Sequence, residues 1–204
     1  MNLPNKLTIF RIILIPICLW LLFADYVPYH YFFAMLAFII ASVTDTLDGR
    51  IARKYNLVTD FGKFMDPLAD KMLVCSILIC FIDLGFAHSI AIVCIIFREF
   101  AISSLRLVAL SNGKVVAANI WGKIKTTVQM VAIVGMLFFA GLADCGAISG
   151  GDGLMLAFNL ASWVMAGVTV ISGVTYISAN RHFLKPAGPV WTASRTAAIK
   201  IRTA

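Results

Sequence analysis

The sequence predicts an all-α integral membrane protein with six transmembrane helices and with both termini in the cytoplasm. Three observations support this fold class. Of the 204 residues, 61% are hydrophobic and 13% are charged, whereas a soluble domain has about 25% charged residues. Six apolar runs come close to or exceed the ~20 residues that cross a bilayer. Most Lys and Arg residues gather at alternate ends of these runs.

The first three spans are predicted at 8–24, 29–48 and 67–84. A short amphipathic segment precedes the first span. No small-residue cleavage site follows this first span, so we interpret it as a membrane span rather than a secretory signal. The second span continues helically into an aspartate-rich stretch. The third is expected to begin around Pro67, because the first turn of a helix does not need the missing N–H of proline.

The last three spans are predicted at 87–110, 121–143 and 153–179. The short connections leave no room for a soluble domain, so residues 1–184 are expected to form one membrane domain. A Pro/Gly-containing break then starts a basic, weakly structured tail at 185–204.

The basic residues orient these spans. The connections near 25–28, 84–87 and 144–152 contain no Lys or Arg, and all 17 basic residues fall at the N-terminus, around 50–71 and 98–125, or in the C-terminal tail. Basic residues accumulate on the cytoplasmic side of membrane proteins, which predicts a cytoplasmic (inner) membrane protein. The net charge of +7 then reflects this topology and attraction to anionic lipids, and nucleic-acid binding is not expected.

The stretch DTLDGRIARKYNLVTDFGKFMDPLAD at 45–70 concentrates five of the ten acidic residues. Asp45 and Asp48 are three residues apart and Asp66 and Asp70 are four apart, so each pair shares a helix face. Oxygen-only ligands suit Mg²⁺ or Mn²⁺, which predicts a metal site for a pyrophosphate-bearing substrate. Two alternatives remain open: solvated charge, the reading favoured for Asp60, and the ion pathway of a transporter.

Basic residues interrupt or flank the fourth and fifth runs. Arg98 and Arg106 are two helical turns apart on one face, and Lys123 and Lys125 begin the fifth run. Together they form a cationic pocket suited to an acceptor that carries its own phosphate. The alternatives are positive-inside anchoring for the lysines and a structural acid pair for Arg98, whose neighbour Glu99 is expected to point to another face.

The pattern Asp45-x2-Asp48-Gly49-x2-Ala52-Arg53-x8-Gly62-x3-Asp66-x3-Asp70 resembles the complete signature of the CDP-alcohol phosphatidyltransferases. The resemblance extends over nearly the whole chain and implies two divalent metals on a CDP-linked lipid. It assigns one metal to Asp45, Asp48 and Asp66 and the other to Asp45, Asp66 and Asp70. Asp70 is also the implied general base. The implied CDP-lipid contacts are Asn5, Thr8, Arg11, Gly49, Arg53 and Thr59.

The segments NLPNKLTIFRIILIP, FREFAISSLR and WGKIKTTVQM are similar to the bacterial phosphatidylglycerophosphate synthase branch of this family. The implied substrates are CDP-diacylglycerol and sn-glycerol 3-phosphate, with direct attack of the acceptor hydroxyl and release of CMP. A homodimer among membrane lipids is the family expectation. Inositol phosphate or phosphatidylglycerol as acceptor remains an alternative, as does, more remotely, a transporter.

Overall fold

A computed structural model of the chain describes residues 3–54, 60–111 and 120–180, and every regular element in these ranges is an α-helix. The prediction of an all-α fold is therefore confirmed for the described residues. The helices are α1 (Leu3–Leu22), α2 (His30–Lys54), α3 (Asp60–Asp83), α4 (Ser89–Ser111), α5 (Ile120–Asp144) and α6 (Asp152–Asn180). The predicted tail at 185–204 lies outside the described residues.

The helices follow the predicted runs closely except next to the aspartates. Helix α2 continues to Lys54, and α3 begins at Asp60. The expectation that Pro67 lies in the first turn of its helix is therefore wrong. An acidic residue at position 60 suits the positive end of the helix dipole, and the helix continues through Pro67 although one backbone hydrogen bond is lost there. Likewise, the N-terminal segment is the beginning of α1 and not a separate element.

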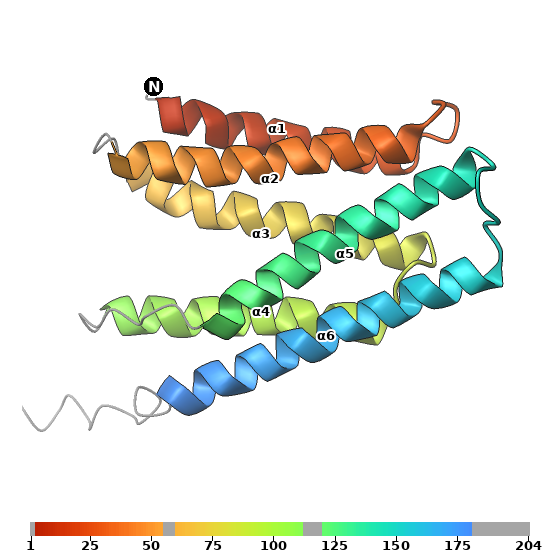
Figure 1. The fold of residues 1–204 in the computed structure, drawn as a ribbon. Coiled ribbons are helices and arrows are strands. Elements are labelled where there is room, and N and C mark those ends of the chain that lie inside the picture. The colour runs from red at the N-terminus through yellow and green to blue at the C-terminus, as the bar shows by residue number, and fades with distance from the viewer. Residues whose placement is uncertain (1–2, 55–59, 112–119, 181–204) are drawn as a thin grey trace, which may run out of the picture.

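The chain runs back and forth, so the connections α1–α2, α3–α4 and α5–α6 lie at one end of the bundle, on the right in Figure 1. Helix α1 packs against α2 and α3, while α6 packs against α4 and α5. Helix α5 crosses the bundle diagonally and also contacts α2. The opposite end therefore gathers the end of α2 and the start of α3, which carry the aspartate motif.

Glycines end α3 and α5 in the same way. Gly85 and Gly146 have φ angles of 73° and 72°, a left-handed conformation that glycine adopts without strain. The next amide in each case donates to a carbonyl five residues back, from Phe86 to Phe81 at 2.8 Å and from Ala147 to Leu142 at 3.0 Å. These are Schellman motifs, and they stop each helix so that the chain can reverse.

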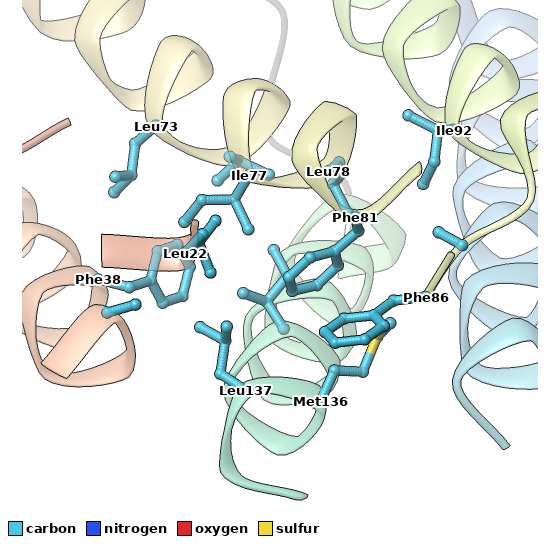
Figure 2. Close-up of a cluster of buried hydrophobic side chains, with 14 of the residues drawn as sticks. Leu22, Phe38, Leu73, Ile77, Leu78, Phe81, Phe86, Ile92, Met136 and Leu137 are labelled. Atoms are coloured by element: carbon cyan, nitrogen blue, oxygen red, sulfur yellow. The ribbon is translucent and has the colours of Figure 1, made fainter. Parts of the chain in front are cut away.

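An apolar core fills the half of the bundle nearest these turns. Leu73, Ile77 and Phe81 of α3 contact residues from α1, α2, α4 and α5 (Figure 2). The Phe86 ring lies 5.6 Å from Phe81 and 4.8 Å from Phe158 of α6, measured between centroids. All six of the described helices thus contribute to one core, which holds the opposite end of the bundle in register.

Two described helical segments are long and apolar enough to cross a bilayer, Ile120–Asp144 and Asp152–Ala179. Leu7–Leu22 and His30–Asp45 are shorter apolar stretches. Large apolar side chains are exposed on all six helices, among them Phe97 of α4 at 74%. Such extensive apolar surface is unusual for a soluble monomer and is consistent with a membrane protein.

Candidate functional site

The aspartate motif occupies two helices that contact each other. Asp45 and Asp48 belong to α2, and Asp66 and Asp70 to α3. Among these four side chains the structure describes that of Asp45. The side chains of Asn5, Gly49 and Arg53, and all of Thr59, also lie outside the described part of the chain. Among the described side chains, no group of three His, Cys, Asp or Glu residues is arranged to hold a metal.

Asp45 makes an ion pair with Arg11 of α1. The Arg11 Nη1 atom lies 2.6 Å from Asp45 Oδ1, and the Arg11 side chain is completely buried. Thr8, one turn earlier in α1, is buried as well. A buried guanidinium needs a counter-charge because leaving it unpaired is costly. The pair therefore fixes α1 against the first aspartate of the motif.

A second charged group joins four helices around Glu99 of α4. Its Oε1 atom contacts Lys125 Nζ of α5 and Arg98 Nη1, the latter at 3.1 Å. Its Oε2 atom lies 3.8 Å from Lys71 Nζ of α3. Arg98 Nη2 also donates to Ser172 Oγ of α6 at 2.5 Å. All four charged side chains are largely buried.

Glu99 was expected to point to another helix face than Arg98, and the structure nevertheless pairs the two side chains. Neighbouring helix positions are about 100° apart, and the long Arg98 side chain bridges this angle to reach the carboxylate. Arg98 is therefore paired with an acid, which was one of the two interpretations of this residue. Its stem crosses α6 at Gly173, where an added Cβ would lie 3.0 Å from Arg98 Cγ.

The structure separates the four basic residues that were expected in one pocket. Arg98 and Lys125 meet at Glu99. Arg106 and Lys123 are exposed, and neither contacts Glu99. Helical spacing correctly relates positions on one helix, but it does not tell which of them another helix covers.

Comparison with known proteins identifies the family. Residues 1–175 match the CDP-alcohol phosphatidyltransferase family model. The chain belongs to the CDP-alcohol phosphatidyltransferase family. This confirms the prediction made from the aspartate signature.

Named relatives of this phosphatidyltransferase come from several bacteria. A Bacillus subtilis protein is 43% identical over 195 residues, which is 90% of this chain and 97% of the relative. A Rickettsia typhi protein is 38% identical over 89% of this chain and 98% of the relative. A Haemophilus influenzae protein is 43% identical over 67% and 76% of the two chains. Each is named CDP-diacylglycerol–glycerol-3-phosphate 3-phosphatidyltransferase.

The region of the phosphatidyltransferase match includes residues that sequence reasoning did not single out. Lys71 and Glu99 join the charged group, and Gln129 lines a cavity beside it. A signal was present for Gln129, which is four residues from the predicted site residue Lys125 and shares its face of α5. Lys71 directly follows Asp70, but its charge was counted only as part of the topology.

Proposed function

We propose that this protein transfers the phosphatidyl group of CDP-diacylglycerol to sn-glycerol 3-phosphate, giving phosphatidylglycerol phosphate and CMP. The observation that carries this is the 43% identity to the Bacillus subtilis enzyme over nearly the full length of both chains. The eight-position aspartate signature supports the same chemistry. The buried cationic group around Glu99 supports an acceptor that carries a phosphate.

The four aspartates fit divalent cations. They offer only oxygen donors, which Mg²⁺ and Mn²⁺ prefer, and they are spaced for one face each on two helices in contact. Asp45, Asp48 and Asp66 would hold one ion, and Asp45, Asp66 and Asp70 the other. Such ions supply positive charge that stabilises the charge developing on phosphoryl oxygens.

Asp70 is the proposed general base. The glycerol 1-hydroxyl oxygen attacks the β-phosphorus of CDP-diacylglycerol, and its proton passes to the Asp70 carboxylate. The new P–O bond forms as the bond to CMP breaks, so the reaction needs no covalent enzyme intermediate. Asn5, Thr8, Arg11, Gly49, Arg53 and Thr59 are the proposed contacts of the CDP-lipid.

Arg98, Arg106, Lys123 and Lys125 are the proposed sources of positive charge for the acceptor phosphate: Arg98 and Lys125 within the buried group at Glu99, and Arg106 and Lys123 from exposed positions outside it. For the membrane topology, we propose that all six helices cross the cytoplasmic membrane, with both termini and the active site facing the cytoplasm. The absence of Lys and Arg from the three short connections at one end of the bundle supports that orientation. The enzyme is proposed to work as a homodimer.

The experiment measures CMP release by purified protein with CDP-diacylglycerol and Mg²⁺. Separate reactions contain glycerol 3-phosphate, inositol phosphate, phosphatidylglycerol or serine. We expect release only with glycerol 3-phosphate. Asp70→Asn should lower the rate by about 10²–10⁴-fold, the usual contribution of a positioned base.

Asp60→Asn is the matched control, because Asp60 lies in the same segment but is assigned no role in the reaction. It should retain wild-type activity. Release with a different acceptor would overturn the glycerol 3-phosphate assignment but leave the family chemistry in place. An active Asp70→Asn enzyme would remove Asp70 from its role as the base.

A further inference from the structure

A small cavity lies between α3, α4 and α5 beside the charged group. Its volume is about 40 Å³, and its polar lining includes Lys71, Glu99, Lys125 and Gln129. One water needs about 10–15 Å³ by the same kind of measure. The cavity is therefore large enough for a compact polar group rather than a single water.

Gln129 adds a neutral donor to this cavity. Gln129 is 3% exposed, and its Nε2 atom has no hydrogen-bond partner among the described residues. Buried polar groups are nearly always hydrogen-bonded. The Gln129 amide N–H and the two neighbouring ammonium groups are all donors, so together they suit an acceptor such as a phosphate oxygen.

The charge of the surrounding side chains fits such a group. Lys71, Arg98 and Lys125 contribute three positive charges, and Glu99 contributes one negative charge, which leaves a formal charge of +2. A phosphate monoester carries about −1.5 to −2 at pH 7. The cavity and its neighbours therefore match the charge of a phosphorylated alcohol.

The position of the cavity suits the proposed reaction. Lys71 is the residue directly after Asp70 in α3, so the two differ by only ~1.5 Å along the helix axis. A phosphate held at Lys71 would keep the rest of a small acceptor at the level of the proposed base. Further along α3, Leu73, Ile77 and Phe81 are buried in the core and close the bundle on that side of Lys71.

Glu99 is the group that connects these donors. Each of its oxygens takes a cation from a different helix, α3 on one side and α5 on the other. Without this carboxylate, three like charges would repel one another across the cavity. We propose that Glu99 is a positioning residue that holds Lys71 and Lys125 at the wall of an acceptor-phosphate site, with Gln129 as the neutral donor.

This inference rests on the proposed function and extends it to three unassigned residues, Lys71, Glu99 and Gln129. The test measures KM separately for glycerol 3-phosphate and for CDP-diacylglycerol. Lys71→Met, Gln129→Leu and Glu99→Gln should each raise KM for glycerol 3-phosphate about tenfold, as expected when a bond to a charged group is lost. KM for the CDP-lipid should stay at the wild-type value. Glu99→Asp, which keeps the charge, should recover part of the loss.

Matched controls are Asp83→Asn, an exposed acid at the far end of α3, and Thr127→Val, an exposed polar residue two positions before Gln129. Both should keep wild-type KM values. A lower KM for glycerol 3-phosphate in Glu99→Gln would mean that Glu99 competes with the phosphate, and this would overturn the positioning role. Unchanged KM in Lys71→Met and Gln129→Leu would overturn the site itself.

A binding measurement covers variants that are too unstable for kinetics. Glycerol 3-phosphate should raise the melting temperature of wild-type protein in detergent, because a ligand that binds only the folded state stabilises it. Gln129→Leu should lose this rise but keep the rise caused by CMP. An equal rise in both proteins would overturn the inference. Failure of wild-type protein to use glycerol 3-phosphate, by contrast, would contradict the proposed function.

Discussion

Helices α3, α4 and α5 each take part in two very different halves of the bundle. Towards the short turns, α3, α4 and α5 contribute Ile77, Ile92 and Leu137 to the apolar core (Figure 2). Towards the opposite end, they contribute Lys71, Glu99 and Lys125 to one charged group. The two halves are adjacent, since Leu73 follows Lys71 by only two residues.

The comparison shows that the two halves hold the helices together by different forces. In a bilayer, apolar side chains gain little from leaving lipid for a protein core, so the apolar half depends on close packing. Charges shielded from water are costly unless they are paired. We therefore expect the charged half to determine which helices meet and the apolar half to determine how tightly they fit.

The largest effect on stability is expected from Glu99→Gln. This change leaves Lys71, Arg98 and Lys125 largely buried without their counter-charge, and breaking a buried pair costs about 3–5 kcal/mol. Thermal unfolding in detergent measures the loss. Asp83→Asn removes an exposed acid and should change stability by less than ~0.5 kcal/mol. If the two variants unfold alike, the charged half does not organise the bundle.

A smaller loss is expected from Phe81→Ala in the apolar half. Phe81 is fully buried among the core side chains, and its truncation leaves a cavity whose cost is about 2 kcal/mol when the transfer part is small. Phe97→Ala is the matched control, because that ring is 74% exposed. A Phe81→Ala loss greater than that of Glu99→Gln would reverse the proposed ranking of the two halves.

Sequence reasoning predicted the apolar half better than the charged half. Hydropathy located the six helices because long apolar runs report directly on burial and lipid contact. Hydropathy ended the second apolar run at 48, although the helix was expected to continue into the motif, and it placed the start of α3 too late, since helical structure continues through the polar motif where hydropathy falls. Asp60, for example, starts α3 seven residues before the expected Pro67.

The charged half depends on contacts between helices that a single sequence does not reveal. Arg98 and Lys125 were expected in one pocket, and they do meet. They meet at Glu99, whose contact with both residues was not predicted. Lys71 and Glu99 are 28 positions apart, so no helical periodicity relates them. The aspartate motif was found more readily because its regular spacing lies within two consecutive helices. The roles assigned to its members stay predictions.

The smallest effect concerns the packing between α2 and α5. An added Cβ at Gly141 would lie 2.8 Å from Phe32 Cε2, and overpacking costs about 1–3 kcal/mol. Because alanine regains up to about 1 kcal/mol in helix propensity, Gly141→Ala should destabilise the protein by about 1 kcal/mol. Gly135→Ala in the same helix meets nothing within 4 Å and should stabilise it slightly. Phe32→Leu should rescue Gly141→Ala if the ring contact is the cause. Equal effects of the two glycine variants would show that close packing does not set the fit of the apolar half.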